Sequence, residues 1–388
     1  MSEKSCSRRD RLFSRVTKLL CTAVVSFSSV GMMVMPTVTR AAETRKVIID
    51  DDGFGIAQWM LLQAPNVEVL GIAGVSGDVW RDEAVSQALR GVEMAGRTDV
   101  PVLKGAVYPL LNSEKLTDRW EALYGKLVWK GAWMRKWVEP TQQSTPPYHA
   151  PDVVPDLPWG NPKIHASNEM AALFMIRKVH EFPGQITIVA TGPMTDLALA
   201  QKLDPEFAHL ARELVYMGGS LNPRQVRKDK VAEQFAREFS NSPRREFNIR
   251  FDPEAASIMM RSPWRKITMI PVDPSTATEL TREQLDAWAK LNPAFAPMLQ
   301  KHEAGFPLWD EIAAAVWLDP SIAMKTEELY VDTDTSFSAG YGDILSWNEG
   351  YQPDVGEQKE VVVREINVQR MNDLIGKLLS RPIPTSTK

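Results

Sequence analysis

The sequence predicts an α/β fold with an open, mostly parallel, doubly wound sheet of the Rossmann-like kind and helices on both faces. Two observations predict it. Short runs rich in Val, Ile and Leu alternate with helical stretches, which is the pattern of βαβ units with right-handed crossovers. The early runs also end in Gly beside a polar residue, which is typical of loops at the carboxyl ends of parallel strands. The predicted strands cover residues 46–49, 67–75, 100–103, 185–190, 213–217 and 266–272.

Length and composition are those of an ordinary globular protein. The chain has 388 residues, of which 44% are apolar and 24% charged, enough for one large α/β domain or two smaller ones. The strands continue without any sign of a second core. We therefore expect one domain over residues 43–388, with insertions at about 107–163 and 222–245.

Residues 1–42 are expected to be an export signal. A basic segment precedes an apolar stretch from Leu19 to Met35, and Thr39-Arg40-Ala41 supplies the small residues that a signal peptidase requires. A retained membrane anchor is the alternative, because 17 residues approach the lower limit for spanning a bilayer. Ser7-Arg8-Arg9-Asp10-Arg11-Leu12-Phe13 resembles the twin-arginine signature, although Arg11 replaces its usual apolar residue. We expect a periplasmic or secreted protein without a membrane anchor after cleavage.

Removal of this segment changes the chemistry of the chain. Both cysteines, Cys6 and Cys21, lie in it, so the mature protein is expected to have neither a disulfide nor thiolate chemistry. The segment carries seven basic and two acidic residues, and its loss takes the formal charge from −4 to −9. An acidic domain argues against binding to nucleic acid and favours a small neutral or cationic substrate.

The first strand ends on three consecutive acids, Asp50, Asp51 and Asp52, followed by Gly53. Adjacent carboxylates repel one another and cannot be buried without a cation or hydrogen-bond donors, so this strand end is the first candidate for a site. A helix over 56–62 and the strand at 67–75 complete a βαβ unit. A helix over 82–95 then leads to the short strand at 100–103.

The first insertion, at about 107–163, is rich in Trp and Pro, and is expected to be partly helical to Val138 and irregular afterwards. Two interpretations are open. Its tryptophans either form a lid that stacks on a flat ring, or they pack the insertion against the body or a partner subunit. They are Trp120, Trp129, Trp133, Trp137 and Trp159.

The second half of the chain resumes the pattern. Thr195 or Asp196 is predicted to cap the helix over 197–203, and Asp252 followed by Pro253 predicts another helix start. The second insertion alternates in charge, which predicts a solvated surface helix. Further helices are expected over 164–179, over 282–291, from Asp310 and over 367–379, with two or three antiparallel strands between 327 and 368.

The acids at the first strand end allow two chemistries. An apolar strand followed by Asp-x-Asp-Gly is similar to the start of haloacid dehalogenase-like phosphatases, in which Asp50 would be the nucleophile and Asp52 the acid/base beside Mg²⁺. That motif is short, and Phe54 departs from it.

A second resemblance covers nearly the whole mature chain. It rests on the acidic strand end and, in the same order, on Thr191-Gly192-Pro193-Met194-Thr195-Asp196-Leu197-Ala198, Met217-Gly218-Gly219, Glu246-Phe247-Asn248-Ile249-Arg250-Phe251-Asp252-Pro253-Glu254-Ala255-Ala256 and Leu308-Trp309-Asp310. The chain resembles the inosine–uridine-preferring nucleoside hydrolases. This resemblance implies hydrolysis of the N-glycosidic bond of a ribonucleoside, with Ca²⁺ holding the attacking water and the ribose diol.

The resemblance also implies roles for individual residues. Asp52 and Asp50 would be the catalytic acids, and Asp52, Thr191 through its carbonyl, and Asp310 would bind the metal. The expected substrate-binding residues are Glu246, Asn248, Asn241 (or Asn222), Asp78 and Trp309. Family members are usually homodimers or homotetramers, so the implied partners are a small nucleoside and further copies of the chain.

Three positions depart from the family pattern. Ile56-Ala57 replaces an Asp-Asp pair whose second member is a calcium ligand, so Asp51 would have to turn inward as a replacement. Asp78 stands where Asn is usual, and Trp309 where many members have a His that protonates the leaving base. Three hypotheses follow: a hydrolase that uses the three acids as a cluster, an exported protein that binds a nucleoside or sugar without hydrolysing it, or acids that are only structural.

Overall fold

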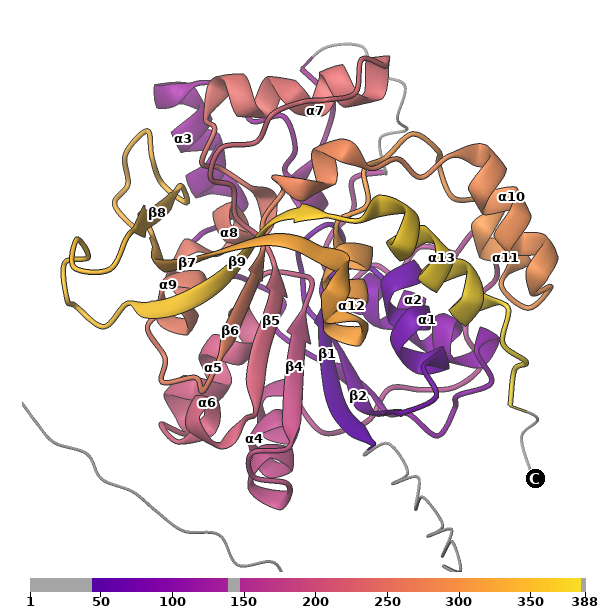
Figure 1. The fold of residues 1–388 in the computed structure, drawn as a ribbon. Helices are drawn as coiled ribbons and strands as arrows, with labels where there is room; N and C mark the ends of the chain where they lie inside the picture. The colour runs from indigo at the N-terminus through magenta and orange to yellow at the C-terminus, as the bar shows by residue number, and fades with distance from the viewer. Residues whose placement is uncertain (1–43, 139–146, 385–388) are drawn as a thin grey trace, which may run out of the picture. The chain divides into compact units, whose positions relative to one another are not determined.

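A nine-stranded sheet forms the centre of the computed structural model, which describes residues 44–138 and 147–384 (Figure 1). The strand order is β3-β2-β1-β4-β5-β6-β9-β7-β8. All neighbours up to β9 are parallel, whereas β7 runs antiparallel to β9 and to β8. The strands are β1 (Arg45–Asp51), β2 (Val67–Gly74), β3 (Val102–Lys104), β4 (Ile186–Ala190), β5 (Glu213–Met217), β6 (Ile267–Ile270), β7 (Ala323–Thr333), β8 (Ile344–Trp347) and β9 (Gln358–Ile366).

Helices connect most of these strands. They are α1 (Ile56–Gln63), α2 (Arg81–Met94), α3 (Glu114–Tyr124), α4 (Ala171–Glu181), α5 (Thr195–Leu203), α6 (Phe207–Leu210), α7 (Lys230–Asn241), α8 (Phe247–Phe251), α9 (Pro253–Met260), α10 (Arg282–Leu291), α11 (Ala296–Leu299), α12 (Asp310–Leu318) and α13 (Val368–Leu379). Three short 3₁₀ helices are η1 (Gly131–Trp133), η2 (Pro274–Ala277) and η3 (Pro320–Ile322). No helix in residues 44–138 or 147–384 is both long and apolar enough to cross a membrane.

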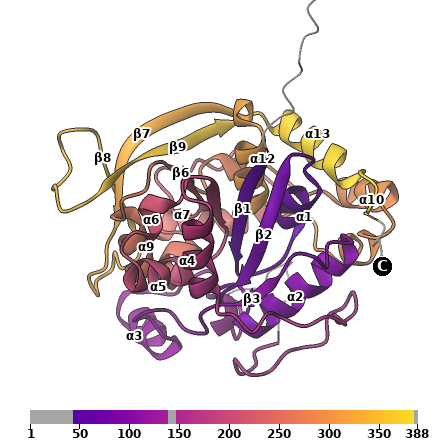
Figure 2. The same ribbon diagram turned by 90° about the horizontal axis from the view of Figure 1, so that it is seen from below.

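The sheet separates two apolar cores. Val47 and Ile49 of β1 pack with residues of α1, α2, α10, α12 and α13, whereas Ile48 packs with α4, α5, α6 and α9 (Figure 2). Successive side chains of a strand point to opposite faces, so a strand covered on both sides reads as a continuous apolar run. Each fully buried Ile contributes roughly 1.5–3 kcal/mol relative to its exposed state.

The order of the strands determines where a ligand can bind. From β1 the chain proceeds to β2 and β3 on one side, and later returns to β4 on the other side of β1. A crevice at the carboxyl ends of the strands is expected at such a reversal. The loops that follow β1, β2, β4 and β5 meet there, and α7 lies beyond these strand ends (Figure 1).

The predicted fold class is confirmed. The late antiparallel strands are also present as β7, β8 and β9, and the closing helix is α13 with Asn367 as its N-cap. The export signal predicted for residues 1–42 lies outside the described residues.

The helix predicted to start at residue 164 begins only at Ala171. The preceding segment follows the edge strand instead, because the Ser167 N–H donates to the Val102 carbonyl at 2.8 Å. Met170 also forms an isolated parallel bridge with Lys104. Extended pairing with β3 therefore replaces the first two turns of the predicted helix.

The predicted cap of α5 was wrong. The helix begins at Thr195 after Met194, and no side chain caps it. The Thr195 hydroxyl donates instead to Asp252 at 2.7 Å, and Asp196 accepts the Ala106 N–H at 2.7 Å. Both side chains therefore make tertiary contacts in place of a cap.

Candidate functional site

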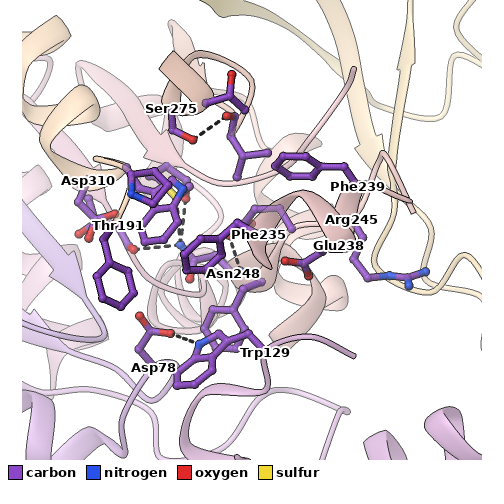
Figure 3. Close-up of a pocket in the computed structure, with 18 of the residues that line it drawn as sticks. Asp78, Trp129, Thr191, Phe235, Glu238, Phe239, Arg245, Asn248, Ser275 and Asp310 are labelled. Atoms are coloured by element: carbon purple, nitrogen blue, oxygen red, sulfur yellow. Dashed lines mark hydrogen bonds between the residues drawn. The ribbon is translucent and has the colours of Figure 1, made fainter. Parts of the chain in front are cut away.

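A cavity of about 280 Å³ opens at the carboxyl ends of the central strands (Figure 3). We call it the strand-end pocket. One part of its lining is acidic or polar and the other is aromatic. The lining residues are Asp52, Asp78, Trp129, Trp137, Thr191, Met217, Gln225, Phe235, Glu238, Phe239, Arg245, Glu246, Phe247, Asn248, Val272, Ser275, Thr276, Glu303, Phe306, Pro307, Trp309 and Asp310.

Asp52 lies on the floor of the strand-end pocket, directly after β1. Its Oδ2 accepts the Asp78 N–H at 2.7 Å, and its side chain is only 4% exposed. Two glycines pack against it: a Cβ atom on Gly77 would lie 2.0 Å from Asp52 Oδ2, and one on Gly192 would lie 2.9 Å from Asp52 Cβ. The loops after β2 and β4 therefore hold Asp52 in one position.

Asp51 points to the same face of the sheet as α12. Its Oδ1 accepts the Thr191 hydroxyl at 2.7 Å, and burial raises the pKa of its carboxyl group to about 7. Ile56 and Ala57, the positions without the family's acid pair, are buried in the apolar core at the start of α1. Asp51 therefore lies beside Thr191 but is not among the residues that line the strand-end pocket, and its role as a replacement metal ligand stays a prediction.

Asp310 approaches these acids from the first turn of α12. Burial raises its pKa well above the usual range, and the charges of Asp51, Glu311, Asp52 and Asp78 raise it further. No described residue forms a hydrogen bond with its side chain. A carboxyl group 259 positions along the chain from Asp51 is thus brought to the end of β1.

Asp50 lies behind the pocket. Its side chain points to the opposite face of the sheet from Asp51, as alternation along a strand requires. There it meets Asp196, and burial together with that neighbouring acid raises the pKa of Asp50 well above its usual range. Asp50 is fully buried and does not line the strand-end pocket, which leaves Asp52 as the strand-end acid that faces it.

The acid cluster is suited to a hard cation by its chemistry. Asp51, Asp52, Asp310 and the Thr191 carbonyl offer oxygen atoms only, which calcium prefers. A bound dication would also relieve the repulsion that keeps these carboxyl groups protonated. Within residues 44–138 and 147–384, however, no group of three or more His, Cys, Asp or Glu side chains already has the spacing of a metal site.

Glu246 and Asn248, at the start of α8, also line the strand-end pocket. Glu246 is the N-cap of α8, and its carboxyl group accepts the N–H groups of Asn248, Ile249 and Gly219 at 2.8 to 3.1 Å. Burial nevertheless raises its pKa to about 7. The Asn248 side-chain amide donates to the Thr191 carbonyl at 3.0 Å and to the Met217 carbonyl at 3.2 Å, so α8 is tied to the ends of β4 and β5.

Asp78 links the pocket to the first insertion. Its Oδ1 accepts the Trp129 indole N–H at 2.5 Å, and Trp129 stacks on Trp137 with ring centroids 5.2 Å apart. Both tryptophans line the strand-end pocket, whereas Trp120 and Trp133 are buried in small separate clusters and Trp159 packs against the main core. Trp129 and Trp137 are therefore placed where a ligand could stack on them, whereas the other three tryptophans pack the insertion against the rest of the domain.

Trp309 belongs to an aromatic cluster that we define as Phe235, Phe306 and Trp309. Phe235 meets Trp309 edge to face at 5.2 Å and 80°, and Phe306 lies 6.2 Å from Trp309 and 5.8 Å from Phe235. All three side chains line the strand-end pocket. Such a surface can receive a flat ring by stacking or by edge contacts.

The sequence prediction missed the contribution of α7. The charged alternation predicted a solvated helix, yet Phe235, Glu238 and Phe239 line the pocket. The outer face is charged as predicted, with Glu233 and Arg237 exposed. The apolar spacing of Val231, Phe235 and Phe239 at i, i+4 and i+8 was the signal for a second, buried face.

Asn241 does not reach the strand-end pocket. It ends α7 and lines a separate hollow with residues such as Lys126 and Arg237. Asn222 is exposed, and its backbone N–H donates to Asp273 at 3.0 Å. The structure therefore brings together Asp51, Asp52, Asp78, Thr191, Glu246, Asn248, Trp309 and Asp310 from the expected site.

Comparison with known proteins points to one family. Residues 47–373 match the family model described as inosine-uridine preferring nucleoside hydrolase. An uncharacterized protein of Schizosaccharomyces pombe is 28% identical over 316 residues, which are 78% of this chain and 76% of that protein. The probable uridine nucleosidase 2 of Arabidopsis thaliana is 33% identical over 220 residues, and the match spans 56% of each chain.

Solved structures show the same fold. A plant nucleoside hydrolase aligns with a TM-score of 0.62 at 23% identity, covering 87% of this chain and all of the other. At this identity the likeness supports the fold, while the family follows from the match over residues 47–373.

Proposed function

The chain belongs to the inosine-uridine preferring nucleoside hydrolase family, and we propose that it hydrolyses the N-glycosidic bond of a ribonucleoside or related N-riboside, releasing base and ribose. One observation carries the proposal. Acids that follow β1 and β2 and begin α12 line one pocket together with aromatic side chains and with Glu246 and Asn248. This arrangement matches a substrate with a polar sugar and a flat base.

Asp52 is the group best placed to act on water. It lines the pocket and is held in one orientation by the Asp78 N–H. We propose that its carboxylate takes a proton from the attacking water, while the surrounding carboxylates stabilise the positive charge that develops on the ribose ring. Burial raises the pKa of Asp52, and a cation bound beside it would favour its ionised form.

We propose that calcium is that cation. Asp51, Asp52, Asp310 and the Thr191 carbonyl would hold it, and when bound it would lower the pKa of the nearby carboxyl groups and orient oxygen ligands. Glu246 and Asn248 would bind ribose hydroxyls, since both face the pocket next to these acids. The aromatic cluster would receive the base.

The proposal also concerns the place of action. Residues 1–42 have the composition of an export signal, and we propose that the mature domain, residues 43–388, works in the periplasm or outside the cell. A phosphatase role for Asp50 and Asp52 loses its support, because Asp50 faces away from the pocket.

The test measures release of free ribose from a panel of ribonucleosides by the purified protein, with calcium or with a chelator. We expect ribose release in calcium, its loss in chelator, and a fall in kcat of at least about 10³-fold in Asp52→Asn, because this variant lacks the general base. Asp286→Asn, on the exposed outer surface of α10, is the matched control and should behave like the wild type.

Two other outcomes would reject the hydrolase, and a third would reject only the role of Asp52. A ligand-dependent rise in melting temperature without ribose release would indicate a binding protein. Hydrolysis of a phosphomonoester would indicate a phosphatase. Equal ribose release by Asp52→Asn and the wild type would remove Asp52 from the reaction.

A further inference from the structure

Helix α7 forms one wall of the strand-end pocket, and the proposed function gives that wall no chemical role. Phe235, Glu238 and Phe239 occupy positions i, i+3 and i+4, which share one face of a helix, and all three line the pocket. The helix therefore presents a single carboxyl group between two aromatic rings. Glu233 lies on the outer face of the same helix and is exposed.

Glu238 lies across the pocket from the acid cluster. In Figure 3, Asp78 and Asp310 occupy one side of the pocket and Glu238 the other, next to Arg245. Glu246 and Asn248 are the expected ribose contacts. A riboside bound with its sugar on these residues and on the acids would direct its base toward the aromatic side, where Glu238 is located.

The Glu238 carboxyl group is available to a ligand. Among the described residues, none forms a hydrogen bond with this side chain. Burial raises its pKa to about 8, the charge of Glu246 raises it further, and only Arg245 opposes the shift. The group therefore keeps its proton at pH 7 and offers one O–H donor.

Trp309 lines the aromatic side of the pocket but is not an acid for the base. Its indole N–H can donate a hydrogen bond but does not release its proton. The remaining charged or titratable groups that line the pocket are Asp52, Asp78, Arg245, Glu246, Glu303 and Asp310. Asp52 and Asp310 belong to the opposite, ribose-facing side, and Asp78 is bonded to Trp129.

We propose that Glu238 is the general acid that protonates the departing nucleobase, an inference that rests on the proposed hydrolase function. As the C1′–N bond breaks, its electron pair passes to the base. The O–H bond of Glu238 breaks, and the proton moves to an acceptor nitrogen or carbonyl oxygen of the base. The water oxygen bonds to C1′ and gives its proton to Asp52, so riboside and water yield ribose and neutral base.

The experiment compares two substrates that differ in their need for an acid. The base of a ribonucleoside is a poor, basic leaving group. The p-nitrophenolate group of p-nitrophenyl riboside leaves as a stabilised anion without a proton. Glu238→Gln preserves the size and polarity of the side chain but has no acidic proton. Glu233→Gln makes the same change on the exposed face of α7 and is the matched control.

We expect kcat for the ribonucleoside to fall by about 10²–10⁴-fold in Glu238→Gln, with little change for the nitrophenyl riboside. Wild-type kcat for the ribonucleoside should decrease as the pH rises through about 8, and Glu238→Gln should lack this decrease. Glu238→Asp should recover part of the lost activity, because it restores an acid. Glu233→Gln should match the wild type with both substrates.

The outcomes separate this inference from the hydrolase itself. An equal loss with both substrates would show that Glu238 only shapes the pocket, and undiminished ribonucleoside hydrolysis would remove it from the reaction; either result overturns the proposal while the hydrolase stands. If Glu238→Gln does not fold, a wild-type profile without the decrease near pH 8 overturns it instead. A wild type that cleaves neither substrate rejects both.

Discussion

Gly77 shows how a single residue without a side chain can position a neighbouring carboxyl group. The loop after β2 passes so close to Asp52 that a Cβ atom on Gly77 would lie 2.0 Å from Asp52 Oδ2. The next residue, Asp78, donates its N–H to the same oxygen. Backbone proximity and a hydrogen bond therefore act together on one carboxylate.

Gly77→Ala is expected to displace Asp52 and to lower kcat for ribose release by at least about 10-fold, since small misplacements of reacting groups are costly. Ribose-release kinetics and thermal melting would check this. Gly376→Ala is the control. Gly376 lies within α13, and the nearest atom to its added Cβ would be Trp288 Nε1 at 3.4 Å. A Gly77→Ala enzyme with wild-type kcat would mean that the loop adapts without moving Asp52.

At the scale of elements, Asp252 joins three segments that are distant in the sequence. Its carboxyl group caps α9 through the Ala255 N–H at 3.1 Å. It also accepts the Thr195 hydroxyl of α5 at 2.7 Å and the Leu110 N–H of the first insertion at 2.9 Å. The predicted capping role of Asp252 is confirmed, and the two additional bonds make it a tertiary link as well.

Asp252→Ala is expected to lower the free energy of unfolding by about 2–4 kcal/mol, because it removes a cap and leaves two buried donors without an acceptor. Urea unfolding would measure the change. Asp319→Ala is the matched control: Asp319 caps the short surface helix η3 and forms a partly exposed ion pair with Arg370, and its loss should cost less than about 1 kcal/mol. Equal losses in the two variants would show that the bonds to Thr195 and Leu110 add nothing.

At the scale of the whole molecule, buried acids without basic partners recur on both faces of the sheet. Burial raises the pKa of Asp51 and Glu246 to about 7, of Asp196 to about 6 and of Glu360 to about 8. Hydrogen bonds, and ion pairs with basic neighbours, lower the pKa of other acids such as Asp319 and Glu213, which therefore titrate below their ordinary values and outside this pH range. Above pH 5 the acids with raised pKa values therefore determine how stability changes with pH.

The metal-free protein is therefore expected to lose stability between pH 5 and pH 8. Each raised group binds a proton in the folded state after the unfolded chain has released it, so its contribution is complete below about pH 4 and disappears as the pH passes its folded pKa. Each such proton lowers the free energy of unfolding by about 1.4 kcal/mol per pH unit between the unfolded and folded pKa values. Urea unfolding in chelator at several pH values would measure it.

The same titration in calcium provides the comparison. If calcium neutralises the cluster of Asp51, Asp52 and Asp310, the loss of stability toward pH 8 should be smaller than in chelator. Stability of the metal-free protein that rises from pH 5 to pH 8 would contradict the assignment of these acids as buried and protonated.

Much of the fold and part of the site follow from local patterns. Apolar runs such as residues 46–49 determine buried strands, and the acids that terminate them cannot enter a core. Asp252 before Pro253 marks a helix start because both act on adjacent backbone groups. These signals place Asp52, Thr191 and Glu246 at the ends of elements, where a parallel sheet gathers its site.

The sequence by itself determined the class of sheet, the family motifs and the acidic end of β1. Only the tertiary structure decided which acids meet: Asp51 faces Asp310, Asp50 faces Asp196, and the inner face of α7 brings Glu238 to the pocket. The physical reason is the distance along the sequence over which each kind of interaction acts. A local pattern fixes the conformation of neighbouring residues, whereas a contact between distant residues depends on how complete elements pack across the sheet.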